Sequence, residues 1–487
     1  MNQLNMFRRR KCWIFSIIIL FLFFHTAGLA YASFTIDDEK KLGKEFYEKL
    51  EKSNVLIRDK KINTYINQLG NKVLAQGQKA PFDFRFSIID SPAINAFATP
   101  GGYVYVNRGL INMVEKESEL ASVLGHEIGH VNARHIASTI EKSQKIGIAT
   151  LAAILAGAFL GRGGDLSAAA VTFSLATATT LNLKYSREHE EEADRLGLSY
   201  LVSAGYDGKA MLDFMKKMKR YEFYSNKIPS YFLTHPGTDE RIAYIDVLLH
   251  TAYTQKGAES MIGNLKRIQT ILMFEEKDLD ASLKHFQNEL QKNRNDVDAL
   301  YGIATIQNRL GRTDESLTNF HKALSLAPND IDISRDLGVV YFRLGRISEA
   351  IEILRKALTL NEDDQDTVLY LGKSYELQDD YITALNLYKK LEKKKIDDID
   401  LYYSIAMAYG KTNNPGDSHY NFGIYFKKKN KMESALFHFK EALKHFPKYS
   451  EKAEEIEQEI KSIESRGKSH DTPLPGAKRR GNLLDHH

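Results

Sequence analysis

Two histidines and a glutamate lie within five residues of one another. His126, Glu127 and His130 fit the pattern H-E-x-x-H, in the middle of a segment with helical periodicity. Histidines four apart on a helix project from one face, so both imidazoles can bind one Zn²⁺ ion. Glu127 is then placed to take a proton from water that attacks a carbonyl carbon. The alternative is a pair of surface histidines, and the rest of the sequence has to decide between the two.

A catalytic zinc ion takes three protein ligands and leaves a fourth position for water, so the motif needs a third ligand. A longer motif that supplies a third histidine requires glycine at position 133 and histidine at position 136, where this chain has Ala133 and Ile136. His135 lies five residues after His130, about 140° round the helix. We therefore expect His135 to pack or hydrogen-bond near the motif.

The acidic run from Ser186 to Asp194 supplies the remaining candidates for the third ligand. Glu190 and Asp194 are four apart and share one helix face, so Glu190 can bind the metal while Asp194 orients a ligand histidine through its free N–H. The other glutamates of the run are expected to face elsewhere. A solvated acidic face is the alternative interpretation of the same run.

Periodicity predicts the elements that position these residues. Apolar residues at helical spacing predict one helix over residues 118–140 and two helices over 35–76. Alternating apolar and polar residues over 82–88 predict a half-buried strand. Two more short strands are predicted over 95–99 and 103–107, with a proline and two glycines between them.

The segment 146–183 is apolar, with Arg162 and Asp165 as its only charged residues. A buried helical hairpin is favoured, because the run 151–160 is too short to span a bilayer. A segment that touches the membrane or covers the site is the alternative.

The first 32 residues have the features of a cleaved export signal. Four basic residues precede the apolar run 13–24, and the small residues Ala30 and Ala32 follow it. An uncleaved anchor is the alternative, but the run is short for a membrane span. Without this segment basic and acidic residues are equal in number, which argues against a nucleic-acid partner. The single cysteine, Cys12, lies inside the segment, so thiolate chemistry and disulfides are excluded.

A repeat with a period of 34 residues begins after about residue 264. Leu310-Gly311-Arg312 recurs as Leu344-Gly345-Arg346, and Gly338 recurs as Gly372. The period and the small residues where helices cross resemble the tetratricopeptide repeat, a helix pair that stacks into a partner-binding superhelix. The phase then slips by half a repeat between residues 406 and 423. A charged helix is expected to end near residue 465, before a disordered tail over 466–487.

The motif, the acidic run and the loop 95–102 together resemble the zinc metallopeptidases related to HtpX, Oma and the CAAX prenyl protease. The export signal and the repeats resemble the periplasmic BepA type of that family. The resemblance implies one zinc ion per chain, held by His126, His130 and Glu190. It implies that Glu127 is the catalytic glutamate and that Asp194 contacts one of the ligands. It also implies that His235 is a switch or a fourth ligand, and that Arg241 contacts a carbonyl or oxyanion.

The sequence therefore predicts a mainly α protein, with a gluzincin-type metalloprotease domain over 35–255 and a tetratricopeptide-repeat solenoid over 264–450. The resemblance implies a periplasmic endopeptidase that degrades misfolded or stalled outer-membrane proteins, with repeats that recruit substrate or assembly machinery. A substrate strand is expected to pair with an edge strand near 103–106. Peripheral membrane contact is a further expectation. The alternative is a chaperone or adaptor that acts through the repeats while the metal site stays latent.

Overall fold

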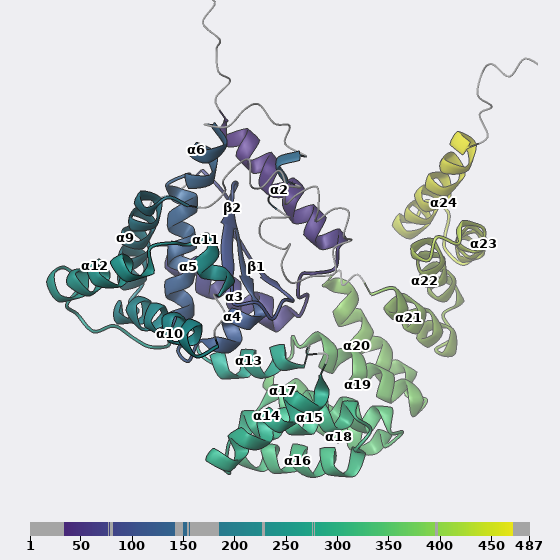
Figure 1. Ribbon diagram of the computed structural model, residues 1–487. Helices are drawn as coiled ribbons and strands as arrows, with labels where there is room; N and C mark the ends of the chain where they lie inside the picture. Colours follow the sequence, from purple (N-terminus) through teal and green to yellow (C-terminus); the bar gives the residue numbers. More distant parts are fainter. Residues whose placement is uncertain are drawn as a thin grey trace, which may run out of the picture. The chain divides into compact units, whose positions relative to one another are not determined.

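The computed structural model describes residues 34–75, 77, 81–141, 150–152, 155, 185–225, 229–274, 276, 278–394 and 398–470. The predicted export signal, most of the segment 146–183 and the tail beyond residue 470 lie outside these ranges. The chain divides into two compact units, residues 1–275 and 276–487 (Figure 1). Among the helices within the described ranges, none is long and apolar enough to cross a membrane.

The first unit has a three-stranded sheet. Strands β1 (Arg85–Ile89), β2 (Ala96–Thr99) and β3 (Tyr103–Asn107) lie in the order β1-β3-β2. β3 pairs in parallel with β1 and antiparallel with β2, across a turn in which Gly101 and Gly102 both have positive φ. The expectation that β3 is an edge strand is wrong, because its backbone is paired on both sides. The prediction of a half-buried strand over 82–88 is also wrong, since β1 is buried on both faces beyond Arg85.

The motif lies on a helix that is buried nearly along its whole length. Helix α5 (Glu117–Asn132) packs against α9 (Arg187–Ser203), the helix of the acidic run. Glycines allow the two backbones to approach closely, since a Cβ at Gly125 would lie 2.9 Å from the carbonyl oxygen of Gly197. A larger residue at this contact would push the motif away from the acidic run.

The predicted helix over 118–140 is in fact two helices. Arg134 has a φ of 54°, which ends α5 and starts α6 (His135–Glu141) in a new direction. Arg134 is held by an ion pair of 2.6 Å with Glu39 and donates to the carbonyl oxygen of Phe34 at 2.9 Å. These partners are distant in sequence, so local periodicity could not predict the break.

Among the described residues of the first unit, seven further helices surround the motif helix and the sheet. They are α2 (Ile36–Lys52), α3 (Lys60–Leu74), α4 (Arg108–Met113), α10 (Lys209–Ser225), α11 (Ser230–Thr234), α12 (Thr238–Thr251) and α13 (Leu265–Met273). Helix α13 packs against α3 and α4, so the first unit extends beyond residue 264, the predicted start of the repeats. Two predicted helices over 35–76 correspond to α2 and α3.

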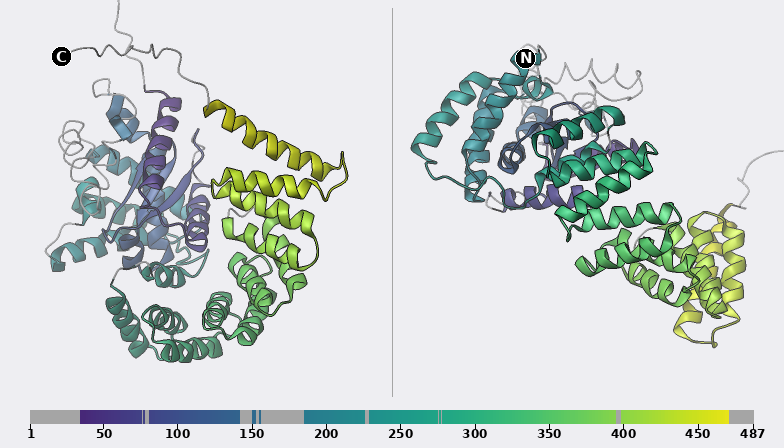
Figure 2. Two further views of the ribbon diagram at one scale, coloured as in Figure 1. Left: turned by 90° about the vertical axis from the view of Figure 1, so that its right-hand side faces the viewer. Right: turned by 90° about the horizontal axis from the view of Figure 1, so that it is seen from below.

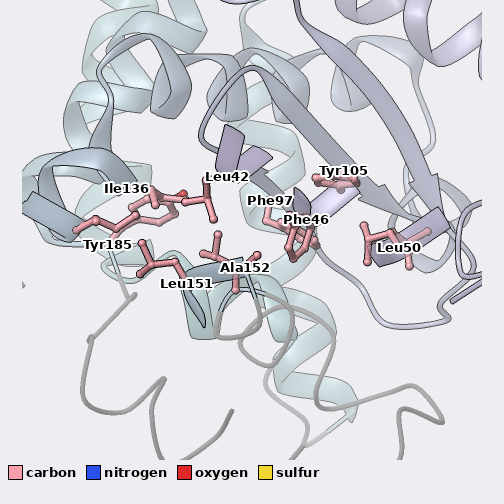
Figure 3. Packing of buried hydrophobic residues seen from close by; sticks show 12 residues of the cluster. Leu42, Phe46, Leu50, Phe97, Tyr105, Ile136, Leu151, Ala152 and Tyr185 are labelled. Carbon is pink, nitrogen blue, oxygen red and sulfur yellow. The ribbon is translucent and has the colours of Figure 1, made fainter. Parts of the chain in front are cut away.

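A core cluster joins α2 to the sheet beside the motif helix. Phe46 packs edge-on against Phe97 of β2 and Tyr105 of β3 (Figure 3). Leu151 and Ala152 are buried in the same cluster. These two residues of the apolar segment 146–183 are therefore buried, as the favoured interpretation expects.

Glu117 fastens the start of α5 to the loop before α13. Its buried carboxylate accepts from the backbone N–H groups of Met261 at 2.7 Å, Ile262 at 2.9 Å and Gly263 at 2.8 Å. The hydroxyls of Tyr206 and Tyr65 also donate to it, at 2.8 and 3.2 Å. Burial alone would raise the pKa of this carboxyl, but the donors hold it below its ordinary value of 4.5.

Replacing Glu117 with alanine is expected to destabilise the first unit by about 3 kcal/mol, because two buried hydroxyls and three partly buried backbone N–H groups lose their acceptor. The depressed pKa means that this stabilisation is full above pH 4.5 and is lost as the pH falls through the lower folded value. Urea unfolding followed by circular dichroism measures both effects, and the transition of the repeats serves as an internal standard. Glu115 is an exposed neighbour, so Glu115→Ala is the control. A loss of stability in Glu117→Ala no larger than that in Glu115→Ala would contradict the proposed role of Glu117.

The second unit is a row of antiparallel helices, seen as a curved stack in Figure 2. They are α14 (Leu279–Lys292), α15 (Val297–Arg309), α16 (Thr313–Leu326), α17 (Ile331–Arg343), α18 (Ile347–Leu360), α19 (Gln365–Leu377), α20 (Tyr381–Lys393), α21 (Ile399–Lys411), α22 (Pro415–Lys428), α23 (Met432–Leu443) and α24 (Glu451–His470). Helix α24 runs to His470, so the predicted end of order at residue 465 is too early. Residues 471–487 lie outside the described ranges.

One helix that serves two repeats explains the slip of phase. Toward α21, Ser418 of α22 donates to the carbonyl oxygen of Ala406 at 2.8 Å, as Ser316 donates to Ala304 in the second helix of an earlier repeat. Toward α23, Gly423 of α22 packs against Phe439, as a glycine in the first helix of a repeat does. Helix α22 therefore closes one repeat and opens the next.

Candidate metal centre

Four buried side chains from three segments converge in the first unit. His126 and His130 come from α5, Glu190 comes from α9, and His235 ends α11. One ligand atom from each lies within 4.8 Å of the other three. Among the described residues this is the one such group, and it contains the three predicted ligands together with the predicted switch.

The separations of these donor atoms fit a small divalent cation. Nε2 of His126 lies 3.0 Å from Nε2 of His130 and 3.5 Å from Oε2 of Glu190. Nε2 of His130 lies 3.4 Å from Oε1 of Glu190. Ligands around a tetrahedral zinc ion at about 2.0–2.1 Å are about 3.3 Å apart. The residues present therefore fit zinc in both spacing and chemical type.

The tautomer of His126 also fits a metal ligand. Its Nδ1 lies 2.8 Å from Oδ1 of Asp194, and a carboxylate can only accept, so the N–H is on Nδ1. The lone pair of Nε2 then points toward His130 and Glu190. Asp194 therefore lies where the contact with a ligand histidine requires it, and its orienting role stays a prediction.

Arg241 lies behind the donors and pairs with both carboxylates of α9. Its Nε and one terminal nitrogen donate to Asp194, each at 2.7 Å, and the other terminal nitrogen lies 2.5 Å from Oε2 of Glu190. Burial alone would raise the pKa of Asp194, but Arg241 and His126 hold it well below its ordinary range. The observed partners of Arg241 are thus two carboxylates, and its contact with a carbonyl or oxyanion stays a prediction.

Glu127 is buried beside the four donors but is not one of them. Its Oε1 lies 3.4 Å from Nε2 of His235, and no described residue donates a hydrogen bond to either carboxylate oxygen. Burial raises the pKa of Glu127, partly offset by His235 and His126. A carboxylate whose affinity for protons is raised in this way suits a general base.

His235 and two tyrosines close the centre. His235 is fully buried, and its Nδ1 lies 3.2 Å from Nε2 of His126 and 3.0 Å from Oε1 of Glu190. Its ring stacks on Tyr231 at 4.4 Å between centroids, and Tyr185 stacks on His130 at 3.7 Å. All four donor residues are therefore buried, with at most 2% of each exposed.

Sequence reasoning missed several residues around the centre, among them Tyr231, which stacks on His235. Tyr185 covers His130, and its place directly before the acidic run was the only hint. The hydroxyl of Tyr244 donates to Asp194, and its position three residues after Arg241 on α12 could have indicated it. Glu192 was expected to face elsewhere, yet its Oε2 lies 3.1 Å from Nε2 of His135. His135 lies beside the motif as predicted, with its Nδ1 2.8 Å from Nδ1 of His130.

Comparison with known proteins matches both units. Residues 58–248 match the model of peptidase family M48, and residues 295–363 and 335–398 match models of the tetratricopeptide repeat. The "Beta-barrel assembly-enhancing protease" of Yersinia pestis is 35% identical over 213 residues, and that of Escherichia coli K12 is 33% identical over 213 residues. Each match covers 44% of this chain and 44% of the relative.

A eukaryotic relative also matches about half of the chain. The "Mitochondrial metalloendopeptidase OMA1" of Schizosaccharomyces pombe is 27% identical over 261 residues, which cover 51% of this chain and 75% of the relative. The chain spans about half the length of the bacterial relatives that it matches. It carries a domain of peptidase family M48 over residues 58–248, followed by tetratricopeptide repeats over residues 295–398.

Proposed function

We propose that this protein is a zinc-dependent endopeptidase of the cell envelope, with one zinc ion held by His126, His130 and Glu190. The observation that carries the proposal is the convergence of these three donors, one of them with its tautomer fixed by Asp194, beside the buried carboxylate of Glu127. The M48 match and the metalloendopeptidase relatives support the same reaction.

Zinc in such a site acidifies bound water and polarises the carbonyl of the scissile bond. Glu127 accepts the proton of the attacking water and passes it to the leaving amine. Asp194 and Arg241 keep the ligands in position. Burial of Glu127 strengthens its tendency to take a proton, because burial disfavours the charged carboxylate.

Ala98 and Thr99 of β2 line a small cavity together with His130 and Tyr185. A peptide segment bound at this cavity would lie beside the metal centre. The protease would degrade misfolded or stalled outer-membrane proteins in the periplasm, and the repeats would recruit them or the assembly machinery.

His235 would hold the enzyme in a resting state by filling the position that water needs. Its imidazole must move away before a substrate carbonyl can approach, so only the fraction of molecules that has opened is active. The closed centre and the protease proposal are compatible, since movement of His235 alone would open the position for water.

Zinc content and cleavage of casein by the purified protein test the proposal. We expect one zinc ion per chain, loss of cleavage with a chelator and recovery with Zn²⁺. His235→Ala is expected to raise the cleavage rate by about 10-fold, because it removes the closed state. His250→Ala, on the exposed face of α12, is the control. If the purified protein contains no zinc, the alternative function is favoured, that of an adaptor that acts through the repeats. If His235→Ala cleaves casein more slowly than the wild type, His235 takes part in the reaction.

A further inference from the structure

The second nitrogen of His130 contacts another histidine, whereas that of His126 contacts a carboxylate. Nδ1 of His130 lies 2.8 Å from Nδ1 of His135, and both rings are buried. A neutral imidazole has one N–H, so only one of these two facing nitrogens can carry a proton. Which one carries it decides whether Nε2 of His130 is free to bind a metal.

Glu192 decides the direction of this hydrogen bond. Its Oε2 lies 3.1 Å from Nε2 of His135, and a carboxylate can only accept. The single proton of His135 is therefore on Nε2, and its Nδ1 accepts from the N–H on Nδ1 of His130. The lone pair of His130 is left on Nε2, which faces Nε2 of His126 at 3.0 Å and Glu190 at 3.4 Å.

The surroundings of His135 hold its ring in this orientation. The break at Arg134 makes His135 the first residue of α6, which turns the ring back toward α9. The imidazole of His189 stacks on it, with 4.3 Å between centroids and 16° between the planes. The side chain of Glu192 at the outer end is 60% exposed, so it can be changed without disturbing the core.

We propose that Glu192 and His135 are positioning residues that fix the tautomer of His130, so that a solvent-exposed carboxylate sets the metal affinity of the buried centre. This inference rests on the proposed zinc site and extends it to two residues outside the ligand set. His126 and His130 are then oriented by different devices, a direct carboxylate for one and a carboxylate acting through an imidazole for the other.

Glu192→Lys reverses the direction of the hydrogen bonds that run from His130 through His135 to residue 192. An ammonium group only donates, so it favours the His135 tautomer with its proton on Nδ1, and His130 must then carry its own proton on Nε2. We expect the zinc affinity, measured by competition with a chelator, to fall by about 10-fold or more. Glu192→Gln keeps an oxygen that accepts and should bind zinc almost as the wild type does. Glu191→Lys makes the same charge change at the adjacent exposed residue and should also bind normally.

His135 provides an independent pair of variants. His135→Leu cannot accept from His130 and is expected to lower zinc affinity by about 10- to 100-fold, whereas His135→Gln has an amide oxygen and should retain more of it. Thermal unfolding of the metal-free proteins separates misfolding from altered affinity. Equal losses of zinc affinity in Glu191→Lys and Glu192→Lys would overturn the inference. Wild-type zinc affinity in both Glu192→Lys and His135→Leu would overturn it as well. A wild-type protein without zinc would overturn the zinc site itself.

Discussion

Replacing Glu127 with glutamine is expected to lower the turnover number for casein cleavage by about 10³-fold or more, while zinc content stays at one ion per chain. Glutamine has nearly the same size, but its amide cannot take a proton from the attacking water. Glu127 is not among the four donor residues, so the metal site should survive the change. The buried surroundings of Glu127 also favour a neutral side chain, so the amide should be tolerated.

Metal analysis and cleavage of casein are measured on the same preparation of Glu127→Gln. Glu119→Gln is a control on the same helix, because Glu119 is also buried and pairs with Lys217 away from the donors. That variant should cleave at close to the wild-type rate. Unchanged cleavage by Glu127→Gln would mean that another group is the base, and loss of zinc would mean that Glu127 supports the metal site.

Elements with strong local patterns were predictable from the sequence. The motif helix, the acidic helix and the three strands follow from apolar spacing, which depends only on neighbouring residues. The break at Arg134 was not predictable, because it depends on an ion pair with Glu39, 95 residues earlier. The central place of β3 also escaped prediction, since β1 pairs directly with β3 and not with β2, the next strand in the sequence.

For the candidate site, residue types and spacing placed the donor residues but not the contacts around them. His126, His130, Glu190 and Asp194 could be selected because residues four apart share a helix face. The direction of Glu192 toward His135 depends on how α6 turns after Arg134, which no local pattern encodes. The ion pairs of Arg241 with two carboxylates of α9 were not predicted, because they depend on how α12 packs against α9.

Replacing Arg241 with methionine is expected to destabilise the metal-free first unit by about 3–5 kcal/mol. Arg241 is buried and balances the charges of Asp194 and Glu190, which would otherwise be two buried carboxylates without a cation between them. Methionine fills most of the space, so the loss reflects charge rather than a cavity. Saturating zinc should restore part of the stability, because a cation beside Glu190 again balances one of the carboxylates.

Arg187→Met is the matched control, because Arg187 pairs with Glu240 and joins the same two helices, α9 and α12, at the surface. These two side chains are 74% and 61% exposed, so the loss should be below about 1 kcal/mol. Urea unfolding with and without zinc measures both variants. Equal losses of stability in Arg241→Met and Arg187→Met would show that the buried ion pairs contribute no more to stability than the exposed one. A loss in Arg241→Met that zinc leaves unchanged would show that the guanidinium and the metal do not act on the same carboxylates.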